Sequence, residues 1–210
     1  MIEAAQPTIN VQLPAQKEGL VSRLRQIITY GGLTYEISRV VVFLVLGVLF
    51  FNTFIGTLFV VSGPSMNPNF HDGQFTLTLK APYFWGRPQR GDVVAIGFPG
   101  DPSIRYIKRI IGLPGEQVQI RRGDIWIYND SYPNGIKLYE EYEPFSTEPE
   151  VSWVVGDDEF FLAGDNRPNS SDSRFFGPVP REFIIGRVWL VFFPFDALKF
   201  IPIPTYNLER

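Results

Sequence analysis

The feature that most constrains the fold is an uncharged apolar run over residues 40–61. No Asp, Glu, Lys or Arg occurs between Arg39 and Asp72. The 22 residues of this run would span about 33 Å as a helix, which is enough to cross a hydrocarbon core of roughly 30 Å. A buried core element would be shorter, and the apolar part of a cleaved signal peptide would be shorter and nearer to Met1. The run therefore predicts a transmembrane helix over residues 40–61.

Basic residues flank this run unevenly. Three arginines precede it closely, and Lys80 is the only lysine or arginine among the twenty residues that follow it. The positive-inside rule then predicts a single-pass protein of the cell membrane, with residues 1–39 as a cytoplasmic tail and residues 62–210 on the trans side. Within the tail, residues 24–36 are expected to form a short interfacial helix.

Composition excludes several kinds of site. There are no cysteines and one histidine, His71, so disulfides, thiolate metal sites, cysteine nucleophiles and multi-histidine metal sites are ruled out. The net charge of −3 argues against nucleic-acid binding, which needs clustered positive charge. We therefore expect no metal, no cofactor and no nucleic-acid partner.

The sequence after residue 61 is typical of a β-rich domain. Short alternating apolar runs are separated by glycine-containing turns, and no helical period of ten residues stands out. This pattern predicts a mainly β, barrel-like domain over residues 62–210. Strands are expected at residues 74–79, 93–96, 106–111, 117–120, 125–128, 160–162 and 187–193.

Residues 137–159 differ from the rest of this domain. They carry eight acidic residues and one basic residue, Lys137. A metal or partner site is one interpretation, and a solvated hairpin or loop inserted in the β domain is the favoured one.

Two stretches contain candidate catalytic groups. Ser65 lies in a turn rich in glycine and proline, where a hydroxyl can be held exposed. A serine nucleophile needs a base, and a lysine can serve if apolar burial lowers its pKa. Of the lysines after residue 61, Lys108 has the most apolar neighbours. On a strand Lys108 shares a face with Tyr106, while Arg109 points the other way, toward water. A structural turn and an edge-strand lysine facing water remain the alternatives.

A third stretch, residues 164–174, is rich in hydrogen-bonding groups and contains no bulky apolar side chain. It is either a disordered surface loop or a buried polar network. In the second case, two charge-assisted pairs could form among Asp165, Arg167, Asp172 and Arg174.

In this order behind an apolar anchor, these stretches closely resemble the type I signal peptidases (leader peptidases). The matching motifs are residues 62–68, 90–94, 106–116 and 164–174, and the last continues to Gly177 and Pro180. The resemblance covers about residues 40–195. It implies a β-rich catalytic domain whose active site faces the membrane surface.

The resemblance also implies roles for individual residues. Ser65 would be the nucleophile, Lys108 the general base, and Ser170 the residue that hydrogen-bonds and orients the lysine amine. The other matched residues would support this site: Asp172 as a brace, Arg174 as its ion-pair partner, and Asp165, Asn166 and Arg167 as the start of the same motif.

The expected substrates are secretory preproteins, cut after small residues in an Ala-X-Ala pattern. The matched substrate-binding positions are Gly63, Met66, Phe70, Tyr106 and Ile107. Gly63 departs from the family, since some members have at this position a Ser or Thr hydroxyl that joins the oxyanion hole. The Ser65 N–H is then the matched oxyanion donor.

Lipid is a second expected partner. The apolar stretch at residues 198–204 is a candidate for insertion at the membrane interface, whereas residues 191–195 are better explained as a packed last strand. Two other functions remain as alternatives: a catalytically inactive, membrane-anchored β domain that binds a partner, and a self-cleaving Ser–Lys protein.

Overall fold

The computed structural model describes residues 16–140, 146–204 and 206. It divides into two units, residues 1–49 and residues 50–210, each of which is considered by itself. The first part of the expected tail, residues 1–15, and part of the acidic stretch, residues 141–145, lie outside the described residues.

The N-terminal helix is long and continuous. Helix α1 covers Gln16–Phe50 and passes into a π-helical turn, Phe51–Ile55. The segment Gly31–Ile55 contains an 18-residue stretch with a mean hydropathy of 2.1 and is long and apolar enough to cross a membrane. Its polar groups are satisfied locally, since the hydroxyl of Thr34 donates to the carbonyl of Gly31. The expected separate interfacial helix at residues 24–36 is wrong, because α1 runs through it without a break.

The helix ends earlier than the apolar run does. Residues predicted as helix up to position 61 instead form strand β1, Gly56–Val60, which pairs with β2, Phe75–Leu79. Gly56 permits this change because a Cβ there would lie 2.6 Å from the carbonyl oxygen of Thr78. The sequence beyond Gly56 has β-branched and aromatic residues that suit a paired strand. Apolar composition alone could not separate the helix from this strand.

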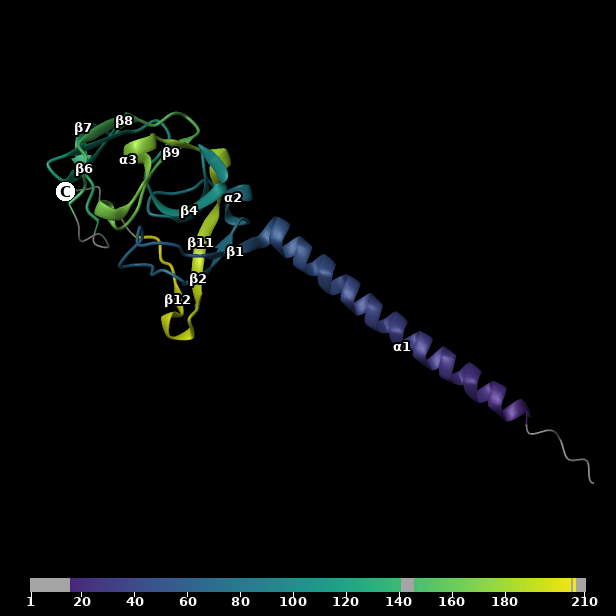
Figure 1. Cartoon of the computed structure of the whole chain (residues 1–210). Coiled ribbons are helices and arrows are strands. Elements are labelled where there is room, and N and C mark those ends of the chain that lie inside the picture. The colour runs from purple at the N-terminus through teal and green to yellow at the C-terminus, as the bar shows by residue number, and fades with distance from the viewer. Residues whose placement is uncertain (1–15, 141–145, 205, 207–210) are drawn as a thin grey trace, which may run out of the picture. The chain divides into compact units, whose positions relative to one another are not determined.

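Two antiparallel sheets form the rest of the chain (Figure 1). The larger sheet has the order β1-β2-β11-β3-β4-β9-β10, and β12 pairs with β11. Its further strands are β3 (Val93–Phe98), β4 (Asp101–Gly112), β9 (Glu159–Ala163), β10 (Val179–Pro180), β11 (Ile184–Phe193) and β12 (Lys199–Phe200).

The smaller sheet has four strands in the order β7-β6-β5-β8. They are β5 (Gln117–Arg121), β6 (Asp124–Asn129), β7 (Tyr132–Lys137) and β8 (Val151–Val154). Strand β8 arises from the acidic stretch 137–159, so the prediction of an inserted solvated loop or hairpin is wrong there. These residues complete a sheet because β8 pairs with β5.

The mainly β fold class is confirmed. All seven expected strands are present, and the α-helices described after residue 61 are short: α2 (Pro82–Trp85) and α3 (Ser173–Phe176). One apolar cluster joins the sheets, since Ile111 and Phe161 of the larger sheet pack with Val118 and Ile127 of the smaller. A second cluster places Met66 and Phe70 against β3 and β11, beneath the turn that carries Ser65.

Candidate active site

Ser65, in the turn between β1 and β2, meets Lys108 of the larger sheet. The Lys108 Nζ atom donates a hydrogen bond of 2.8 Å to the Ser65 Oγ atom. Lys108 lies on β4 opposite Val94 of β3, and its side chain is 1% exposed. Its Nζ atom lies 5.2 Å from the ring centroid of Tyr106, so these two side chains share a face of the strand as predicted. The interpretation of Lys108 as an edge charge facing water is wrong, because β4 lies between β3 and β9.

Burial changes the acid–base behaviour of Lys108. The pKa of Lys108 is lowered from 10.5 to about 8, mainly by desolvation, which Asp172 opposes, Arg174 reinforces and Asp165 opposes. A lysine with this pKa is half neutral near pH 8. The neutral amine is a proton acceptor within hydrogen-bonding distance of a hydroxyl, which is the arrangement that activates a serine nucleophile.

Residues 64–70, here called the serine turn, hold Ser65 in place. Inside the turn, the Phe70 N–H donates to the Met66 carbonyl over 2.9 Å. From outside, the Asn166 N–H donates to the Ser65 carbonyl over 3.0 Å, and the Asn166 Nδ2 atom donates to the Pro64 carbonyl over 3.1 Å. Asn166, one of the predicted support residues, therefore fixes the backbone on both sides of the Ser65 N–H.

Gly63 precedes the serine turn in the left-handed region, with φ of 81°. Its N–H donates to the Asp72 Oδ1 atom over 2.7 Å. The backbone donor of Gly63 is therefore already engaged, and the residue has no hydroxyl to offer. His71 is exposed in the following turn.

Gly164 allows two serines to approach each other. A Cβ at this position would overlap the Ser65 carbonyl oxygen and the Ser170 side chain, whose Cβ would be 2.6 Å away. Any larger residue here would push the serine turn away from residues 164–170.

Ser170 is buried, and its Oγ atom has no hydrogen-bond partner among the described residues. The predicted hydrogen bond from Ser170 to the Lys108 amine is therefore not formed in this structure. The amine is instead bonded to Ser65. A buried hydroxyl without a partner is costly, so a role in the site is one explanation for it.

Asp172 and Arg174 form the predicted ion pair. The Asp172 Oδ1 atom accepts from the Arg174 Nε over 2.7 Å, and Oδ2 accepts from the Gly164 N–H over 2.9 Å. The Arg174 Nη2 atom also donates to the carbonyls of Arg167 and Ser170. This pair thus fixes the loop that carries Ser170.

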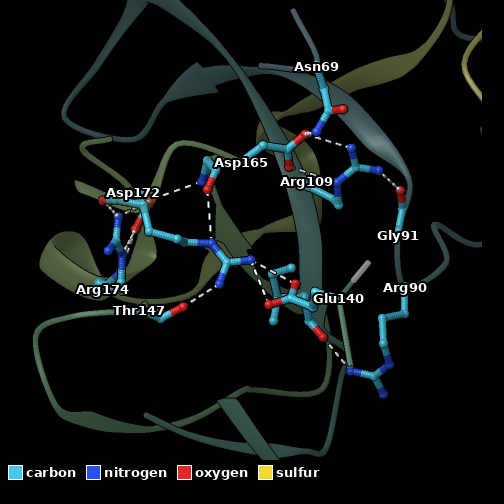
Figure 2. A network of polar contacts seen from close by, with 12 residues as sticks. Asn69, Arg90, Gly91, Arg109, Glu140, Thr147, Asp165, Asp172 and Arg174 are labelled. Atoms are coloured by element: carbon cyan, nitrogen blue, oxygen red, sulfur yellow. Dashed lines mark hydrogen bonds and ion pairs between the residues drawn. The ribbon is translucent and has the colours of Figure 1, made fainter. Parts of the chain in front are cut away.

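Asp165 pairs with Arg109 rather than with Arg167. The Arg109 Nε and Nη2 atoms donate to the Asp165 carboxylate over 2.8 and 2.7 Å. Figure 2 shows Asp165 between Asn69 and Arg109, with Arg109 extending to the carbonyl of Gly91. The prediction that Arg109 faces water is wrong, because residues 108–112 of β4 are buried and the Arg109 side chain lies among them.

Arg167 finds its partner in the acidic stretch. Its Nη2 atom donates to both carboxylate oxygens of Glu140 over 2.7 and 2.8 Å, and its Nη1 atom donates to the Thr147 Oγ1 over 2.5 Å. Of the two pairs expected among residues 165, 167, 172 and 174, the second is therefore wrong, because Asp165 and Arg167 both find partners outside this set. Glu140 belongs to a buried ion pair, as Glu116 does with Arg90. Sequence reasoning missed Glu140 and Thr147, because the sequence shows only that they lie in an acidic stretch and does not show which residue they contact.

The predicted substrate-binding side chains surround this site unequally. Met66 and Phe70 are buried under the serine turn, whereas Tyr106 and Ile107 are half-buried on β4. Among the described residues, no group of three or more His, Cys, Asp or Glu side chains is arranged to hold a metal ion.

Comparisons with known proteins identify relatives across most of the chain. A family model described as "Signal peptidase, peptidase S26" matches residues 34–193. The chain is 36% identical over 166 residues to signal peptidase I of Leptolyngbya laminosa, which covers 73% of this chain and 77% of that protein. It is 36% identical over 177 residues to signal peptidase I T of Bacillus subtilis (strain 168), covering 78% and 88%. A crystal structure of a signal peptidase I from Enterococcus faecalis V583 aligns with a TM-score of 0.42 and 31% identity, over 49% of this chain and 97% of that one.

Proposed function

The chain belongs to the signal peptidase I family of serine-type endopeptidases, and we propose that it removes signal peptides from preproteins by a Ser65–Lys108 dyad. The observation that carries this proposal is the 2.8 Å contact between a buried lysine amine and a serine hydroxyl. The contact joins two motifs that are 43 residues apart in the sequence.

The proposed reaction is acyl transfer in two steps. Neutral Lys108 takes the proton of the Ser65 hydroxyl while the Ser65 Oγ atom attacks the scissile carbonyl carbon. The tetrahedral intermediate collapses, the Lys108 ammonium protonates the departing amine, and the mature protein leaves. Water, deprotonated by Lys108, then attacks the ester. The signal peptide is released with a new carboxylate, and Ser65 regains its proton.

The developing oxyanion needs donors that are already in place. We assign this role to the Ser65 N–H, which lies between two carbonyls fixed by Asn166. Gly63 adds no donor in this geometry, since its N–H is bonded to Asp72.

The other predicted site residues have supporting roles in this proposal. Asp172 and Arg174 act as positioning residues that hold Ser170 beside Gly164. The unpartnered Ser170 Oγ atom is available to accept from the Lys108 ammonium after proton transfer. Asp165 holds the far end of the serine turn by accepting a hydrogen bond from Asn69, and Arg167 donates a hydrogen bond to the carbonyl of Gly164.

We propose cleavage after small residues, in the Ala-X-Ala pattern. Met66 and Phe70 fill the space beneath the serine turn, and Tyr106 and Ile107 are half-buried beside Lys108. Such bulk leaves shallow pockets that accept a methyl group and reject larger side chains. The extended substrate would add to a strand edge near Gly63.

Membrane attachment is the second part of the proposal. Gly31–Ile55 would span the bilayer once, with the N-terminus in the cytoplasm and the β-rich part on the trans side. Strand β2 supports a lipid-facing surface, because its polar side chains face inward and an apolar one faces outward. Thr76 and Thr78 are buried, while Phe75 is exposed. Its neighbour β1 likewise exposes Leu58 and Val60. An apolar outer sheet face suits a bilayer surface better than water.

A cleavage assay with matched serine variants tests the dyad. The full chain in detergent is given a preprotein whose signal ends in Ala-X-Ala, and the new N-terminus is read by mass spectrometry. Ser62 lies in the same motif but is exposed, so Ser62→Ala is the control for Ser65→Ala. We expect Ser62→Ala to cut and both Ser65→Ala and Lys108→Met to be inactive. Cleavage by Ser65→Ala would overturn the assignment, and a wild type that binds the preprotein without cutting it would favour the anchored binding domain.

The pH profile tests Lys108 independently. Only the neutral amine accepts a proton, and the pKa of Lys108 is lowered to about 8. We therefore expect kcat/KM to rise about tenfold per pH unit below pH 8 and to level off above it. A rate at pH 5 equal to the rate at pH 9 would contradict a lysine base.

A further inference from the structure

The last strand of the larger sheet contacts the serine turn. Residues 199–204, here called the C-terminal strap, begin as β12 and continue beside β11, where the Ile201 N–H donates to the Trp189 carbonyl over 2.9 Å. β11 pairs with β3 through residues up to Arg187 and with β12 at Leu190 and Val191. The strap therefore takes the place next to β11 that β3 leaves open.

Alternation gives the strap two different faces. Phe200 is exposed and packs its ring 5.0 Å from that of Trp189. Ile201 is buried in the cluster that contains Met66 and Phe70. The interfacial role expected for residues 198–204 stays a prediction: Leu198 and Phe200 are exposed, whereas Ile201 faces the core.

Lys199 contacts the serine turn directly. Its Nζ atom donates to the Asn69 carbonyl and lies 5.3 Å from the centroid of the Phe70 ring. The Asn69 side chain is bonded in turn to Asp165 over 2.9 Å. Asn69 is thus held from two sides, by the strap through its carbonyl and by the ion pair of Asp165 through its amide.

The far end of the strap lies close to Gly91, whose carbonyl contacts the Arg109–Asp165 ion pair. Pro204 lies against Gly91, where a Cβ would be 2.9 Å from the Pro204 Cδ atom. The Gly91 carbonyl accepts from Arg109, the partner of Asp165. A mostly apolar cavity of about 250 Å³ lies between the strap, Phe70 and Arg109. The strap is therefore held at Lys199, at Ile201 and at Pro204.

We propose that the C-terminal strap positions Ser65 for catalysis, with Lys199 and Ile201 as its two positioning residues. Asn69 is four residues from Ser65, and the Phe70 N–H bond to Met66 makes the intervening turn stiff. A shift of Asn69 therefore moves Ser65 relative to Lys108, and a displacement of about 1 Å at a reacting group can cost up to about a hundredfold in rate. This inference rests on the proposed Ser65–Lys108 chemistry for its effect on rate, but not for the contact itself.

The test replaces Lys199 in the full chain in detergent. Lys199→Met removes the bond to Asn69, and Lys199→Arg keeps a cationic donor. Lys137→Met is the matched control, because Lys137 is a lysine of the smaller sheet that pairs with Asp124. The measurements are amide hydrogen exchange of a peptide covering residues 62–74, together with kcat, KM and the melting temperature.

We expect Lys199→Met to exchange faster over residues 62–74 and to lose about tenfold in kcat. Its KM and melting temperature should match those of Lys137→Met, and Lys199→Arg should restore both exchange and kcat. Unchanged exchange in Lys199→Met, or a fall in kcat that only follows the melting temperature, would overturn the proposal. If Ser65→Ala proved active, the proposed Ser65–Lys108 dyad would be wrong. The hydrogen-exchange result would still test whether the strap holds the serine turn in place.

Discussion

The two sheets differ in how many charged side chains they bury. In the smaller sheet, β5 and β6 point Val118, Ile120, Ile125 and Ile127 inward, and their cluster is apolar throughout. In the larger sheet, β2 buries threonines, and the region around Lys108 buries ionised residues on β4 and in residues 164–174. Apolar burial supplies most folding free energy, whereas buried charge is costly unless it is paired. Apolar clusters in both sheets therefore stabilise the fold, and the larger sheet additionally maintains a costly polar site.

This difference predicts how each region responds to the loss of one partner. In the polar region, removing one member leaves an uncompensated charge away from water. In the apolar region, removing a methylene leaves a small cavity. The expected effects below run from the largest to the smallest.

The largest loss is expected from Arg109→Met. Asp165 would keep a buried carboxylate without its main partner, since both Arg109 contacts to it are lost. Breaking a buried pair in this way costs about 3–5 kcal/mol of unfolding free energy. This loss of unfolding free energy is measured by denaturant unfolding of the full chain in detergent, with tryptophan fluorescence as the signal.

A second variant makes this test sharper. Arg109→Met with Asp165→Leu removes both charges, and we expect it to recover most of the lost unfolding free energy. Activity should be low in the double variant, because Asp165→Leu removes the carboxylate that accepts from Asn69. A double variant as unstable as Arg109→Met would show that lost packing, rather than an unpaired charge, causes most of the destabilisation.

Lys108→Met is expected to stabilise the protein while abolishing activity. Burial lowers the pKa of Lys108 from 10.5 to about 8, which corresponds to a cost on the order of 3 kcal/mol for keeping the ammonium buried at neutral pH. Methionine fills similar volume without that cost.

The pH dependence of stability identifies the cause. Between about pH 8 and 10.5 the unfolded chain binds more protons at Lys108 than the folded chain does, so wild-type stability rises with pH in this window. The advantage of Lys108→Met should therefore be complete below pH 8 and disappear as the pH reaches 10.5. An advantage that did not change with pH would point to better packing instead.

A smaller loss is expected from Ile127→Val in the apolar region. Ile127 is fully buried between the sheets, and deleting one methyl group costs about 0.5–1.5 kcal/mol. The same unfolding measurement should show this loss with kcat unchanged, because no described contact joins Ile127 to the serine turn. A fall in kcat of tenfold or more would contradict the separation of the two regions.

The sequence predicted the apolar region and the strands better than it predicted the polar contacts. Alternation gave the seven expected strands and placed Lys108 on the face of Tyr106, because side-chain period follows from backbone geometry. It failed where an apolar run changed from helix to strand at Gly56, since both elements are apolar there.

Ion-pair partners were the least predictable feature. Asp172 and Arg174 are two residues apart, and their pair was predicted correctly. Asp165 and Arg109 are 56 residues apart, and Arg167 and Glu140 are 27 apart. These pairs depend on which strands become neighbours in the sheets. A charged residue alone does not specify a distant partner, so Arg109 was assigned to water and Glu140 to a solvated loop.

The smallest effect is expected from an ion pair on the outside of the smaller sheet. Lys137 and Asp124 lie 2.8 Å apart, but their side chains are 43% and 39% exposed. Water and salt screen such a pair, so a double-mutant cycle with Lys137→Met and Asp124→Asn should give a coupling free energy below about 1 kcal/mol. The coupling should shrink further in 1 M salt. The Arg109–Asp165 pair has a similar separation of 2.7 Å, so burial rather than distance accounts for the difference. A coupling at Lys137–Asp124 as large as the loss in Arg109→Met would remove burial as the reason that the two regions differ.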